Sequence, residues 1–397
     1  MVISDIKEFM NGVNPHGKRM SDRGVFQLVV ISVVILAHSY LYVTIGRLLD
    51  WHLEAIWFAV GILAIVSMGG TRLLGTPRRR RAAISPQGAI YRFGASWNVM
   101  VVLWAAFMMI STLFLEPSMT SRTISCILSF AICSYGIMEA GTVRIARLEL
   151  QTEKLPRRGR LRLVQLTDLH IGPYSSLKHL SKIVETALLS GPDLIAITGD
   201  LVDGAVGDKG GISPYYEPFA EKLRELRQAA TRFGVWAVPG NHDFYENFEG
   251  AAAFMKRSGV KLLRGEAMDL GVVVLAGADD LDHLSGSESR QGITKSEDLL
   301  LSLDPALSDK FVLFLRHRPI VERRTVGHFD LQLSGHTHGG QLLTLPSSRH
   351  RIPGRSRGLL SLGRGSYMYV SNGAGFVGPP MRFLAPAEIV VIDLVRD

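Results

Sequence analysis

The residues best suited to chemistry lie in the loop Ser334-Gly335-His336-Thr337-His338-Gly339-Gly340-Gln341. The loop places two imidazoles one residue apart, among glycines, directly after the apolar run 329–333. On a tight turn leaving a strand, both side chains can point into one cavity. Imidazole is the commonest neutral metal ligand near pH 7. A lone His-x-His loop is weak evidence, because such pairs also occur on solvated loops.

Four further clusters of the same kind follow predicted strands. They are Thr167-Asp168-Leu169-His170 after 161–166, Gly199-Asp200-Leu201-Val202-Asp203-Gly204 after 194–198, Pro239-Gly240-Asn241-His242-Asp243 after 235–238, and Arg316-His317-Arg318-Pro319 after 311–315. Each cluster alone has an ordinary interpretation as turn or capping chemistry. Ligand sites of open α/β sheets, however, lie just beyond the carboxyl ends of strands. Five clusters in equivalent positions therefore favour a functional site.

The ligand types indicate a metal centre. Carboxylates, imidazoles and an amide oxygen, without a thiolate, suit divalent manganese, iron or zinc. The candidates outnumber the ligands of one tetrahedral site. Two divalent ions that share a bridging carboxylate fit better, and such pairs lie about 3.5–4 Å apart to clamp an in-line phosphoryl displacement.

The elements that must position these clusters begin near Leu161. Short apolar runs alternate with amphipathic helices, the first at 177–188 and later ones near 218–231 and 247–258. Further strands are expected at 260–263, 272–276, 329–333, 368–370 and 388–394. Strand–helix alternation followed mostly by strands predicts an α/β layered domain over 161–397 rather than a doubly wound sheet. Residues 144–160 read as a basic linker.

The clusters and their order resemble the calcineurin-like metallophosphoesterase superfamily over about 161–397. The tail segments Tyr369–Gly375 and Met381–Ile389 resemble its bacterial membrane-associated branch. The resemblance implies a four-layer α-β-β-α sandwich, with a dinuclear site at one end.

The resemblance also implies a role for each site residue. Asp168, His170 and His338 match ligands of the first metal, Asp200 the bridging ligand, and Asn241, His317 and His336 ligands of the second. His242 matches a histidine that approaches the leaving oxygen, and Asp203 the acid that orients it. A metal-bridging hydroxide would attack phosphorus in line, and His242 would stabilise or protonate the leaving group.

Arg316 and Arg318 flank His317 and depart from the family pattern. Two added cations can bind a second phosphate of a diphosphate substrate, so both are candidate substrate-binding residues. The alternative is that they point to solvent, as exposed arginines commonly do. Asp279, Asp280 and His283 lie on a later loop, for which a plain loop role is favoured over substrate contact.

The first third of the chain reads as a membrane region. The sequence is 47% hydrophobic, and apolar segments at about 25–49, 51–70, 96–115 and 123–141 are each long enough to span a bilayer. Together they predict a transmembrane region over 25–143 after a tail at 1–24. Tryptophan and tyrosine near the segment ends disfavour a buried soluble helical core.

Arginine and lysine concentrate before the first span, between the second and third, and after the fourth. The positive-inside rule then predicts a multi-pass inner-membrane protein with both termini and the catalytic domain on the cytoplasmic side. This distribution also accounts for much of the net charge of +8, so no nucleic-acid partner is expected. Cys126 and Cys133 lie in the fourth span, where core packing is their default role.

The sequence thus predicts a membrane-anchored phosphohydrolase that acts on a phosphodiester or pyrophosphate. A site near the inner leaflet favours a lipid-linked substrate, and the resembled branch includes enzymes that cleave UDP-2,3-diacylglucosamine. The alternatives are a membrane scaffold with a non-catalytic phosphoesterase domain, which the intact ligand set disfavours, and a nuclease of the same superfamily. The lack of an aromatic and basic groove signal disfavours the nuclease.

Overall fold

The computed structural model describes residues 36–40, 43, 86–114, 119–172, 175–203, 206–208, 211–229, 232–245, 247–280, 297–307, 309–341 and 357–396. The chain divides into two compact units, one formed by 1–75 with 93–133 and the other by 76–92 with 134–397.

The N-terminal region is helical where it is described. Helix α4 covers Pro86–Phe114 and α5 covers Met119–Ala140. By length and composition, Thr123–Ala140 is the one described stretch that can cross a membrane, and a shorter apolar helix covers Ser96–Ser111. The spans predicted at 25–49 and 51–70 lie almost entirely outside the described residues.

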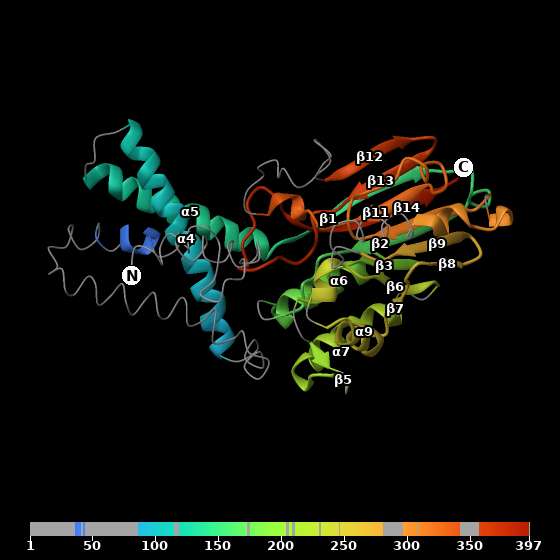
Figure 1. Ribbon diagram of the computed structural model, residues 1–397, viewed down its shortest axis with the longest axis horizontal. Coiled ribbons are helices and arrows are strands. Elements are labelled where there is room, and N and C mark those ends of the chain that lie inside the picture. Colours follow the sequence, from blue (N-terminus) through green and yellow to red (C-terminus); the bar gives the residue numbers. More distant parts are fainter. Residues whose placement is uncertain are drawn as a thin grey trace, which may run out of the picture. The chain divides into compact units, whose positions relative to one another are not determined.

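Two six-stranded sheets form the core of the second unit (Figure 1). The first sheet has the order β1 (Val143–Gln151), β14 (Ala387–Val395), β2 (Arg160–Leu166), β3 (Leu194–Thr198), β6 (Gly234–Val238), β7 (Lys261–Leu262). The second has the order β12 (Gly358–Gly363), β13 (Ser366–Val370), β11 (Leu331–Ser334), β10 (Phe311–Arg316), β9 (Val273–Ala278), β8 (Glu266–Asp269). A separate two-stranded hairpin joins β4 (Gly207–Asp208) to β5 (Gly211–Ile212). The predicted mixture of helices and layered sheets is confirmed.

Apolar side chains hold the two sheets together. Leu163 and Leu194 of the first sheet share a buried cluster with Leu313 and Leu333 of the second. Every residue of β3 is buried, as expected for a central parallel strand covered on both faces.

Helices cover the other face of the first sheet. They are α6 (Leu177–Leu189), α7 (Glu217–Ala229) and α9 (Phe248–Arg257), and α8 (Asn241–Tyr245) is a short turn after β6 (Figure 1). Ser176 begins α6, because its hydroxyl accepts a hydrogen bond from the His179 N–H. The outer face of the second sheet packs against the helical residues 297–301 and the turn Pro305–Leu307.

The predicted linker at 144–160 is wrong over most of its first half. Residues 143–151 form β1, which pairs in parallel with β14 along its whole length. Ala146, Leu148 and Leu150 pack against the core between the sheets, whereas the charged residues that alternate with them face solvent. Those charges suggested a linker, but the same alternation is typical of an edge strand with one buried face. The edge strands β8 and β12 were also not predicted.

Candidate metal centre

Five parallel strands bring the predicted clusters to one end of the two sheets. Strands β2, β3 and β6 are neighbours in the first sheet, and β10 and β11 are neighbours in the second. The structure gathers their following residues into three overlapping groups that can hold a metal ion. The groups are Asp168, His170 and His338; His170, Asp200 and His242; and Asp200, His317 and His336.

Five of these side chains stand on backbone with positive φ. The values are 54° at Asp168, 46° at His170, 50° at Asp200, 69° at His336 and 51° at His338. Left-handed backbone costs a non-glycine residue on the order of 1–2 kcal/mol. Hydrogen bonds between strand ends hold it, with the Asp168 N–H donating to Gly199 O at 3.1 Å and the His170 N–H to Asp200 O at 3.0 Å. Strain is therefore concentrated where side chains must converge.

The first group surrounds the Asp168 carboxylate, which is fully buried. His338 Nε2 lies 3.2 Å from Asp168 Oδ1, and His170 Nε2 lies 3.0 Å from His338 Nε2. The Thr167 hydroxyl and the His336 N–H both donate to this carboxylate. The loop 334–341 thus contacts Asp168, in the cluster after β2, through the His336 main chain and through the His338 ring.

The second group surrounds the Asp200 carboxylate. His317 Nε2 lies 3.0 Å from Asp200 Oδ2, and His336 Nδ1 lies 3.2 Å from His317 Nε2. His317 Nδ1 donates to the carbonyl of Thr198 at 2.9 Å. That bond turns Nε2 toward Asp200, which is the arrangement that presents a histidine lone pair to a metal.

Asn241 completes the donor set. Its Nδ2 donates to the Tyr245 hydroxyl at 2.9 Å, while its buried Oδ1 has no hydrogen-bond partner among the described residues. The next N–H, that of His242, donates to Asp200 Oδ1 at 2.8 Å and fixes this loop beside the second group. A buried amide oxygen without a partner is costly unless a cation binds it. Carboxylate, imidazole and amide donors together fit a hard or borderline divalent ion.

Burial and opposite charges set the protonation of these groups. Burial raises the pKa of Asp168 and Asp200, but the facing histidines lower it more, so both pKa values end below the usual range. Burial lowers the pKa of His317, but the Asp200 charge outweighs it and raises that pKa to about 10. The negative charge of Asp200 favours a proton on His317, and for the same reason it favours a metal cation bound in place of that proton.

Burial keeps the two histidines of the loop 334–341, His336 and His338, in the neutral form. Burial lowers the pKa of His338 to about 4, despite the adjacent Asp168. Burial and the neighbouring His317 place the pKa of His336 well below its usual value. A neutral imidazole is the form that binds metal, so no proton need be displaced from either ring.

His242 and Asp203 form a separate pair at the edge of the centre. His242 Nδ1 and Asp203 Oδ1 are 3.0 Å apart, and the His242 ring meets the His170 ring edge-on at a centroid distance of 4.7 Å. Burial lowers the pKa of His242, but the hydrogen bond that its ring donates to Asp203 and the charge of Asp200 raise that pKa above the usual value. With Nδ1 donating to Asp203, Nε2 is the atom left for another partner.

Asp243 is a site residue to which the sequence analysis gave no role. Its buried carboxylate accepts hydrogen bonds from the N–H groups of Gly240 at 2.8 Å and Val202 at 3.0 Å. It therefore ties the loop after β3 to the loop after β6. Burial and the nearby Asp200 raise its pKa to about 6. Its position next to His242 in the cluster was the available signal.

The flanking arginines have different environments. Arg316 is only 3% exposed, and its guanidinium binds the carboxylate of Glu297. This buried ion pair disfavours a substrate role for Arg316, which stays a prediction. Arg318 is partly exposed and pairs with Asp280 at 2.9 Å, so its substrate role stays a prediction. Asp279 pairs with Arg264, and His283 lies outside the described residues.

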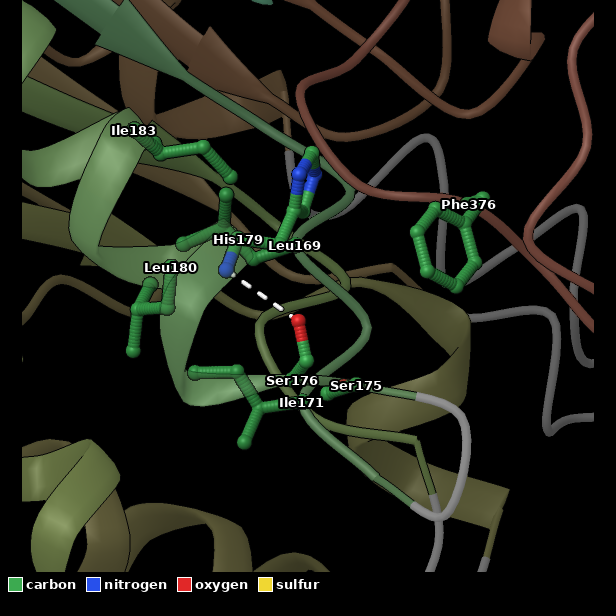
Figure 2. Close-up of a pocket in the computed structure, with 8 residues that line it drawn as sticks. All are labelled: Leu169, Ile171, Ser175, Ser176, His179, Leu180, Ile183 and Phe376. Atoms are coloured by element: carbon green, nitrogen blue, oxygen red, sulfur yellow. Dashed lines mark hydrogen bonds between the residues drawn. The ribbon is translucent and has the colours of Figure 1, made fainter. Parts of the chain in front are cut away.

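A small apolar pocket lies beside the first group (Figure 2). It is lined by Leu169, Ile171, Ser175, Ser176, His179, Leu180, Ile183 and Phe376. Leu169 separates Asp168 from His170 in sequence, so the pocket backs directly onto a strand end of the metal centre. Its walls come from the start of α6 and from the loop after β13.

Comparison with known proteins decides the family. The calcineurin-like phosphoesterase family matches residues 161–340. A metallophosphoesterase of Aquifex aeolicus is 32% identical over 263 residues, which is 66% of this chain and 95% of the relative. The chain belongs to the calcineurin-like phosphoesterases. It is therefore a phosphoesterase hydrolase, of a family that uses divalent metals.

Two other relatives of this phosphoesterase extend well beyond the matched region. A metallophosphoesterase of Campylobacter jejuni is 31% identical, and the match covers 59% of each chain. A protein of Danio rerio named a transmembrane protein with metallophosphoesterase domain is 29% identical over 70% of this chain and 63% of its own.

Replacing Gly335 by alanine is expected to disrupt the centre. A Cβ there would lie 2.2 Å from Asp168 Oδ2 and from Thr167 Oγ1, closer than any side chain can approach. We expect the Gly335→Ala protein to lose most of its bound metal, measured by elemental mass spectrometry on the purified full chain. Gly141→Ala is the matched control, because a Cβ there makes only ordinary contacts. Wild-type metal content in Gly335→Ala would contradict the close packing described.

Proposed function

We propose that the protein is a membrane-anchored, dinuclear metal-dependent phosphohydrolase that cleaves a lipid-linked phosphodiester or pyrophosphate. The overlap of the ligand groups carries this proposal. His170 Nε2 is 3.8 Å from Asp168 Oδ1 and 3.7 Å from Asp200 Oδ2, so both carboxylates lie close to one imidazole nitrogen. Such spacing supports two adjacent ions, which enzymes place about 3.5–4 Å apart.

Asp168, His170 and His338 would hold the first ion, and Asn241, His317 and His336 the second. Asp200 would bridge them, because its two oxygens already face different partners. Oδ1 accepts from the His242 N–H and Oδ2 lies against His317. Manganese, iron and zinc all suit this donor set.

Bound divalent ions would acidify a water molecule and neutralise charge on the phosphoryl oxygens. The chain's own residues would do the rest. His242, protonated because Asp203 and Asp200 favour its cationic form, would donate a proton from Nε2 to the leaving oxygen. Asp203 would hold the ring in the orientation that its bond to Nδ1 sets.

The N-terminal region supports a lipid-linked substrate. Thr123–Ala140 has the length and hydropathy of a membrane span, and it leads directly into β1 of the phosphoesterase unit. A relative is named as a transmembrane protein with this domain. Four spans, with the catalytic unit on the cytoplasmic side, would keep the metal centre near the headgroups of the inner leaflet.

A substrate panel tests the proposal. We expect the purified full chain to hydrolyse model phosphodiesters and a nucleotide diphosphate-linked lipid such as UDP-2,3-diacylglucosamine, and phosphomonoesters poorly. Asn241→Ala should lower each turnover by on the order of 10²-fold or more, because loss of even an outer ligand contact costs 10- to 100-fold. Equal turnover by wild type and Asn241→Ala would instead favour a non-catalytic domain.

Metal analysis tests the dinuclear assignment. His336→Ala and His338→Ala should each lower the metal content from about two ions per chain to about one, because each removes a ligand of a different ion. In manganese-loaded protein, the electron paramagnetic resonance signal of a coupled pair should disappear from both variants. The exposed His328 gives the matched control, His328→Ala. A wild-type signal from either variant would count against the assignment.

The pH profile tests the role of His242. Because Asp203 raises the pKa of His242, the ring stays protonated to a higher pH than an isolated histidine. Asp203→Asn keeps a hydrogen-bond acceptor for Nδ1 but removes the charge. We expect the alkaline limb of kcat against pH to move to lower pH, and kcat at its maximum to fall. An alkaline limb that stays in place would exclude His242 as the proton donor.

A further inference from the structure

The loop of residues 376–385 joins β13 to β14 and is almost wholly apolar. It reads Phe-Val-Gly-Pro-Pro-Met-Arg-Phe-Leu-Ala, and its arginine, Arg382, is fully buried. Val377 is 37% exposed and Leu384 is 57% exposed. The following strand β14, by contrast, buries most of its apolar side chains in the core.

The loop is seated on the last turns of α5. The Arg382 N–H donates to the carbonyl of Gly136 at 2.9 Å. The rings of Phe383 and Tyr135 meet edge-on, with centroids 5.7 Å apart. The missing side chain of Gly136 allows this approach, because a Cβ there would lie 3.3 Å from Arg382 O and 3.5 Å from Met381 Cε.

This seat lies close to the C-terminal end of α5. Gly136 precedes the end of the stretch Thr123–Ala140 by four residues, which is roughly 6 Å along a helix. On the same turns, Tyr135, Ile137 and Met138 are 41%, 46% and 72% exposed. If Thr123–Ala140 spans a bilayer, the loop lies at the level where acyl chains meet headgroups.

The loop backbone suits such an environment. Pro379 and Pro380 have no N–H to leave unsatisfied. The N–H groups of Val377 and Phe383 donate to the side chain and carbonyl of Gln341, at 3.0 and 2.6 Å. Few donors therefore lose hydrogen bonds when water is replaced by lipid, which keeps the cost of transfer low.

The same loop is tied to the metal centre. The Arg382 guanidinium donates to the carbonyls of Asn372 at 2.9 Å and Gly373 at 3.1 Å. Gly373 packs against Asp168, where an added Cβ would come within 2.8 Å of the aspartate Cβ. Phe376, at the start of the loop, lines the pocket beside the first group together with His179, and the two rings are tilted at 41° with centroids 5.6 Å apart (Figure 2).

We propose that the 376–385 loop and the exposed face of the last α5 turns dock into the lipid headgroup–acyl interface and deliver a lipid-linked substrate to the metal centre. The proposal rests on the membrane anchoring in the proposed function. The exposed Arg357 guanidinium donates to Leu384 O at 3.1 Å and places positive charge at the rim of this surface, where anionic headgroups are attracted. A substrate phosphate can then reach the centre while its acyl chains stay in the bilayer.

Depth-dependent quenching tests the docking. Single-cysteine proteins are made from the full chain with Cys126→Ala and Cys133→Ala, adding Val377→Cys, Leu384→Cys or Met268→Cys. Each is labelled with an environment-sensitive dye and reconstituted into phosphatidylethanolamine and phosphatidylglycerol vesicles. Met268 is the control, because it is 40% exposed on β8 at the edge of the second sheet.

We expect lipids with a quencher near the headgroup to quench the dyes at 377 and 384 several-fold more than the dye at 268. Equal quenching at the three positions would overturn the docking. Because this readout needs no turnover, it decides the docking even if the substrate panel finds no activity and the proposed function fails.

Turnover tests the delivery. Leu384→Asp should lower the ratio of lipid-substrate turnover in vesicles to water-soluble phosphodiester turnover by about tenfold, because an anionic side chain weakens interfacial binding. Met268→Asp is the matched control and should leave the ratio as in wild type. An unchanged ratio in Leu384→Asp would overturn delivery through this surface.

Discussion

The burial of two carboxylates side by side is the constraint on which the structure depends. Asp168 and Asp200 are 0% and 2% exposed, and both lie within 3.8 Å of His170 Nε2. Uncompensated, such charges would be prohibitively costly in a protein interior. Four histidines and the Asn241 amide oxygen lie in the same region, and together these groups are donors that can hold divalent cations. The surrounding fold supplies the rigidity that keeps these groups together.

That rigidity has a local conformational cost that the sheets offset. Five candidate ligand positions have positive φ, and hydrogen bonds between the ends of β2 and β3 hold this backbone at Asp168, His170 and Asp200. Glycines remove the side chains that would block this convergence. A Cβ at Gly240 would lie 2.2 Å from Asp200 Oδ1. Strain at ligand positions and glycine beside them are thus two results of the same crowding.

Parts of the chain far from the metal loops also reach the centre. Arg382 links the loop before β14 to the backbone around Asp168, and that loop rests on the end of α5. The last turns of α5, the loop before β14 and the loop after β2 therefore form one continuous set of contacts within the second unit. A phosphohydrolase with a lipid-linked substrate would need such continuity, because the lipid must meet the metal centre at the depth of the bilayer surface.

The sequence by itself determined the family and the central strands, and it predicted the residues that the structure gathers into the candidate metal groups. These follow from local patterns: an apolar run, then Asp, His or Asn at its end. Tertiary structure decided the rest. It made residues 143–151 a strand, because pairing with β14 buries their alternate apolar side chains. It buried Arg316 against Glu297 and gave Asp243 and Arg382 their places between loops. Those roles depend on partners distant in sequence, which no local pattern specifies.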